Sequence, residues 1–256
     1  MIRDLGPYSS RNTSKGALIE ETGQIIAALS SGLPLEEVRK RALEGNILKQ
    51  RTRISRKRVW DLIHYRLLTH KTSWVLEDLK KTYLIKGRHS SDFITLLYLH
   101  YCLRDKLTFD FVTQIIWQSW NQRKLDISRN DILAFLDTLS EAQPQVARWT
   151  LSSRRKLAGS ILTALRDFGL LKGSQKKKIH KPPLPLSTAE HLLHILISEG
   201  LRGKEPVDDP AWRLFLLSAD EVSNVLSQLS QAKLIRFERS GHTVVLDTPA
   251  NWSSLS

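Results

Sequence analysis

The sequence predicts a mainly α fold, with an N-terminal helical bundle followed by two winged-helix-like units that carry small β-hairpins. Apolar residues recur at three- and four-residue spacing along most of the chain, which is typical of amphipathic helices. Strand signals are nearly absent before residue 125. After it, the order of helices followed by a hairpin is inferred twice, and this is the plan of the winged helix-turn-helix. A hydrophobic content of 41% in 256 residues is enough to form such cores.

Residues 1–125 are predicted to form the N-terminal helical domain. Gly32 and Pro34 separate its first two helices, and a basic linker leads into a basic helix at 53–69 with Ser55 as the expected N-cap. Later in this domain, the apolar run 93–103 is shorter than the roughly 20 residues that span a bilayer. We therefore expect a buried core helix there, with Cys102 packed inside it rather than reactive. The predicted helices of this domain are 15–30, 35–43, 53–69, 73–85, 90–104 and 108–120.

Residues 126–185 are predicted to form the first winged-helix-like unit. Ser128 begins a short helix that ends near Leu136, and a longer helix at 152–168 ends at Gly169, a C-terminal position that favours glycine. Strands are expected at 170–173 and 179–186, joined by an exposed turn. The prolines at 182, 183 and 185 would confine the second strand to a sheet edge, or would make the basic tail a linker.

Residues 186–256 are predicted to form the second such unit. Its helices are expected at 188–197, 210–217 and 219–232. Apolar residues then alternate along 234–246 on both sides of Ser240-Gly241, which predicts a β-hairpin.

The charge balance favours a polyanionic partner. The chain carries 39 Lys and Arg against 26 Asp and Glu, a formal net charge of +13, and its pI is about 10.0. The start of the sequence has no apolar segment like that of a signal peptide, and no apolar run is long enough for a membrane span. Nucleic acid is therefore preferred over a membrane surface. A single cysteine permits no internal disulfide, and we expect the protein in the cytoplasm.

The helix 152–168 is the strongest candidate for nucleic-acid contact. Its apolar residues fill one broad arc, and the opposite arc carries cations and small polar residues with no acid before Asp167. Such a helix suits a major groove, where cations neutralise phosphates and small residues allow close approach. A lysine-rich tail follows and would act as the wing. The candidate DNA contacts of this unit are Ser152, Arg155, Lys156, Ser160, Thr163, Arg166, Lys176, Lys177 and Lys178.

A second basic patch covers residues 49–71, in which Asp61 is the only acid. Arg56, Lys57 and Arg58 would fill the first turn of a helix after Ser55, where the helix dipole disfavours cations. A bound anion would remove that conflict, although long cationic side chains also lie over apolar surface in many proteins. The candidate contacts here are Arg51, Arg53, Arg56, Lys57 and Arg58.

Other features argue against catalysis and metal binding. In the last unit acids outnumber cations, so we interpret it as a protein-facing module. His191 and His194 have no cysteine or well-spaced carboxylate nearby, which is unlike a zinc site. No nucleotide-binding loop or hydrolase motif occurs. We expect no catalytic residues, no metal or cofactor and no small-molecule substrate.

Four segments resemble the BrxA family of bacterial BREX phage-defence systems: Leu18-Ile-Glu-Glu-Thr, Gly32-Leu-Pro-Leu-Glu-Glu-Val-Arg, Asn46-Ile-Leu-Lys-Gln-Arg-Thr-Arg and Arg58-Val-Trp-Asp-Leu-Ile-His-Tyr-Arg-Leu. The resemblance in helix order and length covers most of the chain. It implies a cytoplasmic, non-enzymatic DNA-binding accessory protein that works with other BREX proteins. The family offers no catalytic residues to carry over.

These observations predict a protein that binds double-stranded DNA mainly through phosphates, with low sequence specificity. Two alternatives remain. The basic surface also suits structured RNA, and it equally suits an acidic protein partner held in a scaffold. A nuclease is a third and weaker interpretation, because no carboxylates cluster in the sequence.

Overall fold

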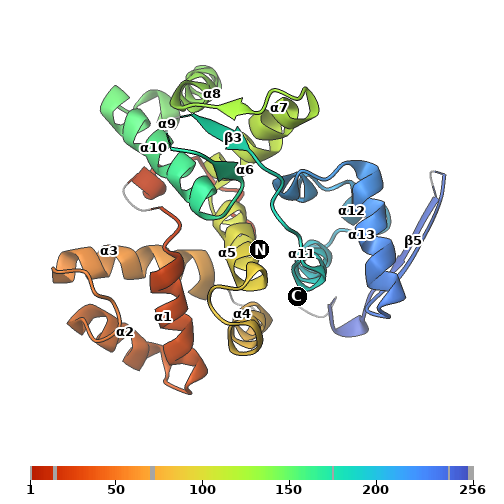
Figure 1. Ribbon diagram of the computed structural model, residues 1–256, viewed down its shortest axis with the longest axis horizontal. Helices are drawn as coiled ribbons and strands as arrows, with labels where there is room; N and C mark the ends of the chain where they lie inside the picture. Colours follow the sequence, from red (N-terminus) through yellow and green to blue (C-terminus); the bar gives the residue numbers. More distant parts are fainter. Residues whose placement is uncertain (1, 14–15, 70–72, 175, 242, 253–256) are drawn as a thin grey trace.

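The computed structural model describes residues 2–13, 16–69, 73–174, 176–241 and 243–252. The predicted mainly α fold is confirmed, since helices make up most of these residues and strands form only two small antiparallel sheets. Figure 1 shows three groups of elements around the central helix α5 (Ser91–Leu103). Their apolar residues form one continuous core that includes both Ile2 and Trp252, and the division into three domains remains a prediction.

Helix α5 is the centre of this core. Every residue from Thr95 to Leu103 is buried, as expected for a helix that is apolar on all sides. Ser90 caps its start, and its Oγ accepts a hydrogen bond from the amide of Phe93. Cys102 is fully buried, and burial raises the pKa of its thiol well above the ordinary range. The predicted core role of Cys102 is confirmed. No helix in the described part of the chain is long and apolar enough to cross a membrane.

The elements before α5 follow the predicted helices closely. Helix α3 begins at Arg53, the predicted start, but Thr52 and not Ser55 is its N-cap: the Thr52 Oγ1 accepts a hydrogen bond from the Ser55 amide. Lys15 and Lys71, which were assigned to the first helix and the second basic patch, lie outside the described residues. The elements are η1 (Arg11–Thr13), α1 (Ile19–Ser30), α2 (Leu35–Glu44), α3 (Arg53–Ile63), the π-helix η2 (His64–Leu68) and α4 (Ser73–Lys86).

The next group forms the upper part of Figure 1. Ser128 caps α8, as predicted, in a reciprocal pair with Asp131. The three strands form an antiparallel sheet in the order β1-β3-β2, of which β1 was not predicted. The predicted strand at 179–186 is wrong, because β3 ends where the proline-rich segment begins. The elements are α6 (Lys106–Asp110), the π-helix η3 (Phe111–Ile116), α7 (Trp117–Asn121), β1 (Asp126–Ile127), α8 (Arg129–Ala142), α9 (Pro144–Ala147), α10 (Leu151–Asp167), β2 (Leu171–Lys172) and β3 (Lys177–Ile179).

The last group lies on the other side of α5 and ends in the predicted hairpin. Strands β4 and β5 pair antiparallel, with Phe237 opposite Leu246 and Ser240 opposite Thr243, so the turn falls where the sequence predicted it. His242, in that turn, lies outside the described residues. The elements are α11 (Leu186–Ser198), α12 (Glu205–Asp208), the 3-10 helix η4 (Pro210–Phe215), α13 (Ala219–Gln231), β4 (Arg236–Ser240), β5 (Thr243–Asp247) and η5 (Ala250–Trp252).

Two histidines of α11 are buried where this group meets α4 and α5. The Nδ1 of His191 is 2.7 Å from Asp78 Oδ2, and its Nε2 is 2.9 Å from His100 Nε2. The ring of His194 is stacked between Trp74 and Trp252, at centroid distances of 3.7 and 4.6 Å. Burial, followed by the neighbouring His191, lowers the pKa of His194 to about 4. Both histidines are therefore structural parts of the core, and His194 is neutral at pH 7.

This stack predicts a pH-dependent stability. Because the pKa of His194 is near 4 in the folded protein and about 6.5 when unfolded, its contribution is present above pH 6.5 and is lost as the pH falls towards 4. We expect His194→Phe, which keeps a ring between the two tryptophans, to reduce the acid-induced loss of unfolding free energy by roughly 2 kcal/mol. Urea unfolding of both proteins at pH 7.5, 5.5 and 4.5 measures this difference. Equal pH dependence in the two proteins would contradict it.

Candidate nucleic-acid interface

Helix α10 presents the cationic face that the sequence predicted, but only part of that face is open. Thr150 caps the helix by accepting a hydrogen bond from the Ser153 amide at 3.2 Å. Leu157, Ile161 and Leu165 are fully buried and orient the opposite side outward. Among the candidate contacts, Ser152, Arg155, Lys156 and Arg166 are exposed, whereas Ser160 and Thr163 are half-buried.

The half-buried part of this face is covered by the N-terminal segment, which we define as residues 2–13, and by the residues that follow it. Element η1 packs on α10, and Thr163 lies beside Gly16. The hydroxyl of Thr163 donates to the carbonyl of Gly159 within the helix, at 2.8 Å. Arg166 forms an ion pair with the adjacent Asp167. The open cationic surface of α10 is therefore concentrated near its N-terminus, at Arg155 and Lys156.

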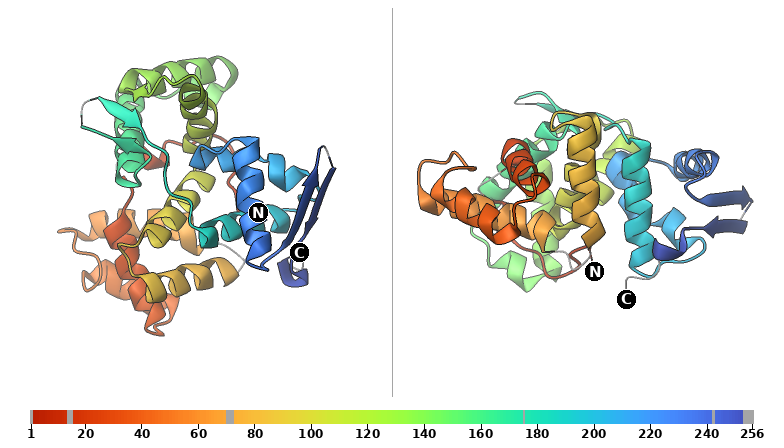
Figure 2. Two further views of the ribbon diagram at one scale, coloured as in Figure 1. Left: turned by 45° about the vertical axis from the view of Figure 1, so that its right-hand side comes forward. Right: turned by 90° about the horizontal axis from the view of Figure 1, so that it is seen from below.

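The β2–β3 hairpin projects beside α10 (Figure 2). Gly173 permits its turn, since its φ is +103° and a Cβ there would lie 2.3 Å from the Lys176 carbonyl oxygen. Lys172 and Lys178 are directly opposite each other across the two strands. Like charges in such a pair repel each other, so a bound anion would stabilise them. Lys176 and Lys178 are exposed, and Gln175 lies outside the described residues.

Lys177 does not have the exposed position that the sequence predicted. It belongs to β3, where side chains alternate between the two faces, and it shares the buried face with Ile179. Its aliphatic stem is covered, and its Nζ donates to the carbonyl of Ser174 at 2.5 Å. The assignment of Lys177 as an exposed contact is therefore corrected. The basic tail loses a second cation, because Lys181 forms an ion pair with Glu221 of α13.

The second basic patch also divides into exposed and structural cations. Arg51, Arg53, Lys57 and Arg58 are exposed, and Lys57 pairs with Asp61 one turn later, at 2.7 Å. Because α3 begins at Arg53, residues 56–58 do not fill its first turn, and the predicted conflict of these residues with the helix dipole is wrong.

Arg56 is half-buried and holds the connection between α2 and α3. Its Nε donates to the Leu43 carbonyl and its Nη1 to the Gln50 carbonyl, both at 2.8 Å. Arg66, which the sequence placed in the same patch, is buried altogether and contacts the residues that lead into α1. Both guanidinium groups stabilise the fold, so the open part of the patch is smaller than the sequence indicated.

Part of each patch lines one cleft of about 690 Å³, whereas the exposed Arg51, Arg53 and Arg155 lie outside its lining. Lys57 and Arg58 of α3 line the cleft together with Lys156 of α10 and Arg11 of η1, the short element that lies between these helices in Figure 1. Among the described residues of the lining Asp61 is the single acid, and the lining also includes the hydroxyl residues Ser10, Thr13 and Ser153 and the apolar Ile54 and Leu62. We call this the cationic cleft. It joins residues that are about a hundred positions apart in the sequence.

Arg11 is the cation of the cleft that the sequence did not single out. It belongs to a short 3-10 turn without amphipathic periodicity or neighbouring cations, so no pattern distinguishes it. Its guanidinium lies over the ring of Tyr65, with its Cζ 3.5 Å from the ring centroid. The hydroxyl of Tyr65 in turn donates to Asp4. The ring therefore holds Arg11 at the edge of the cleft while leaving the side chain exposed.

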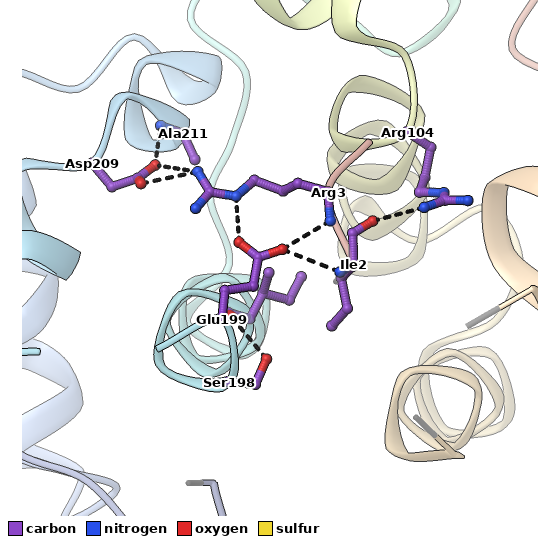
Figure 3. A network of polar contacts seen from close by, with 8 residues as sticks. Ile2, Arg3, Arg104, Ser198, Glu199, Asp209 and Ala211 are labelled. Atoms are coloured by element: carbon purple, nitrogen blue, oxygen red, sulfur yellow. Dashed lines mark hydrogen bonds and ion pairs between the residues drawn. The ribbon is translucent and has the colours of Figure 1, made fainter. Parts of the chain in front are cut away.

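The far end of the N-terminal segment is fixed to the last group of elements. Arg3 forms ion pairs with Glu199 at the end of α11 and with Asp209 before η4, the latter at 2.9 Å (Figure 3). The amides of Ile2 and Arg3 both donate to Glu199 Oε1. Arg104 donates to the Ile2 carbonyl from the end of α5. The N-terminal segment thus links the C-terminal elements with the cationic cleft.

Together, the fold and the cleft define a mainly helical protein with one composite basic surface. The family model of BrxA matches residues 6–195, a range that contains the whole cleft. The chain therefore belongs to the BrxA family, which supports a BREX-associated role. No curated protein shows significant sequence similarity to it.

The fold also resembles the crystal structure of an uncharacterized protein from Magnetospirillum magneticum. The TM-score is 0.62 at 18% sequence identity, over 83% of this chain and 100% of that chain. At this identity the likeness concerns the fold alone.

The role of Arg56 can be tested through stability. Arg56→Met keeps the aliphatic stem but removes the donors to Leu43 and Gln50, so we expect the free energy of unfolding to fall by about 1–3 kcal/mol. Arg53→Met, at an exposed position of the same helix, is the matched control and should change it by no more than about 0.5 kcal/mol. Urea unfolding measures both. Equal stabilities of the two variants would show that the hydrogen bonds of Arg56 do not hold the α2–α3 connection.

Proposed function

We propose that the protein is a non-enzymatic accessory component of a BREX phage-defence system that binds duplex DNA. The main observation behind this proposal is that Lys57 and Arg58 line the same cationic cleft as Lys156, although they are far apart in the sequence. A fold that brings like charges together from distant parts of the sequence loses electrostatic energy unless an anion binds there. Family membership supports the association with BREX, and other BREX proteins are the expected protein partners.

The order of elements around α10 supports a winged helix-turn-helix. Strand β1 precedes α8, the short α9 leads into α10, and β2 and β3 follow with β3 in the middle of the sheet. In such a unit, α10 is the recognition helix and the β2–β3 hairpin is the wing. Arg155 and Lys156 would lie at the groove, and Lys176 and Lys178 would contact the neighbouring backbone.

The exposed groups favour contacts with phosphates over reading of bases. Cations dominate the open surface, and a cation neutralises a phosphate regardless of sequence. Ser160 and Thr163, which were expected to approach bases, are half-buried, and Thr163 lies beside Gly16 in the segment leading into α1. Low sequence specificity follows. The cleft also suits binding rather than catalysis, since its carboxylate, Asp61, is already paired with Lys57.

Charge reversal at the N-terminus of α10 tests this proposal. In fluorescence-anisotropy titrations at 100 mM salt, Arg155→Glu with Lys156→Glu should weaken duplex binding by at least about tenfold, because it replaces two phosphate contacts by repulsion. The matched control is Lys81→Glu with Lys86→Glu on α4, which makes the same charge change with exposed residues outside the cleft and hairpin. Equal losses in the two double variants would indicate that only net charge matters.

Salt dependence and competition identify the ligand. If about 6–10 phosphates are neutralised, affinity should fall by about 10³–10⁵ between 50 and 200 mM salt, and a flat response would contradict the proposal. Preference for structured RNA over duplex DNA in competition would make RNA the ligand. Co-purification with an acidic protein that nuclease treatment leaves unchanged, without DNA binding, would favour a scaffold.

A further inference from the structure

Arg11 has the geometry of a ligand-binding side chain that is held ready by its surroundings. Its guanidinium is stacked on Tyr65, yet the residue is exposed and lines the cationic cleft. The preceding and following parts of the chain hold it in place, because the Tyr8 hydroxyl donates to Asp110 at 2.6 Å and Asn12 Oδ1 accepts from the buried Arg66 at 2.7 Å. Stacking leaves the planar edge of a guanidinium available for paired hydrogen bonds to an oxyanion.

Three cations of the cleft form no direct ion pair with a described carboxylate, and the nearest acid to Arg11 is Asp4, whose pKa the Arg11 charge lowers across the Tyr65 hydroxyl. Lys57 forms an ion pair with Asp61, but no described acid lies within ion-pair distance of Arg11, Arg58 or Lys156. These three side chains come from η1, α3 and α10, so three separate elements surround one volume. The hydroxyl of Ser153 adds a polar group to the same lining. Two guanidinium groups and an ammonium around a shared space match the charge and hydrogen-bonding capacity of a phosphate.

We propose that Arg11, Arg58 and Lys156 hold one and the same phosphate group, a phosphodiester of the DNA backbone. This site rests on the proposed function, and it adds Arg11 and the N-terminal segment to the binding surface. The DNA backbone is thereby held at one point between α3 and α10, while the β2–β3 hairpin contacts the DNA backbone at another point. Because Arg3 anchors the same segment to Glu199 and Asp209, the C-terminal elements contribute to the position of Arg11 (Figure 3).

A double-mutant cycle tests whether the cations share a phosphate. Arg11→Gln and Arg58→Gln should each weaken duplex binding by about tenfold, since each loses charged hydrogen bonds. If they hold the same phosphate, the double variant should lose clearly less than the product of about a hundredfold, because the second substitution acts on a contact that is already broken. Arg11→Gln with Lys178→Gln on the hairpin is the reference pair and should give the full product.

Folding and charge controls accompany the cycle. All three substituted residues are exposed, so melting temperatures should be unchanged. Arg11→Lys keeps the charge but not the planar fork, and it should show a smaller loss than Arg11→Gln. If the Arg11→Gln, Arg58→Gln double variant loses as much affinity as the product of the two single losses, the shared site is overturned. Unchanged affinity of Arg11→Gln would overturn it too.

A second measurement uses inorganic phosphate and the full chain labelled with ¹⁵N-arginine. Phosphate should shift the Nε–H resonances of Arg11 and Arg58 along one saturation curve, whereas chloride at equal ionic strength should not. The resonances are assigned with Arg11→Lys and Arg58→Lys. Absence of any phosphate-dependent shift at either arginine would overturn the site.

The two measurements separate this inference from the proposed function. Shifts with phosphate in a protein that does not bind duplex DNA would keep the anion site and contradict DNA binding. Duplex binding that depends on Arg155 and Lys178 but not on Arg11 would keep DNA binding and contradict the shared site.

Discussion

The buried guanidinium of Arg66 is the contact on which the arrangement of the cleft depends. A charged group removed from water costs several kcal/mol unless its donors are satisfied, and burial lowers the pKa of Arg66. Its Nη2 donates to Asn12 and its Nη1 to the carbonyls of Gly16 and Ala17, while its Cζ lies 4.6 Å from the Tyr101 ring centroid. Asn12 on one side and Gly16 and Ala17 on the other are therefore held at Arg66. This arrangement places η1 on α10 and, with it, Arg11 between the two basic helices.

The sequence was sufficient for the helices because their signals are local. Caps such as Ser128 and glycines such as Gly169 act within a few residues, and the burial of α5 follows from its mostly apolar composition. The strands of the first sheet were harder to place. Strand β1 has two residues, too few for an alternating pattern, and it forms only because β3 lies beside it. Thr52 was missed as the N-cap of α3 because Thr52 and Ser55 are both good N-caps, and the position of Arg56 beneath α2 favours Thr52.

The candidate site likewise contains residues that the sequence predicts and residues that it does not. Exposed cations such as Arg155 and Arg58 follow from helical periodicity, since the opposite face of each helix is apolar. Charge alone does not distinguish Arg56, Arg66 and Lys177 from these, because a cation that satisfies backbone carbonyls has the same sequence signature as one that faces solvent. The convergence of α3 and α10 depends on packing between residues that are far apart in the chain. Arg11 was missed for that reason: its significance comes only from what lies around it.

The ion pairs of Arg3 have a consequence for how the protein is made. Their partners, Glu199 and Asp209, lie 196 and 206 positions later in the chain. On the ribosome, where the chain emerges from its N-terminus onward, the first residues therefore have no access to these carboxylates until most of the protein has been synthesised. The ion pairs of Arg3 can therefore form only after α5 and both basic helices have been synthesised. Contacts of such long range also slow folding, and a chain truncated before Glu199 lacks the carboxylates that link its two ends.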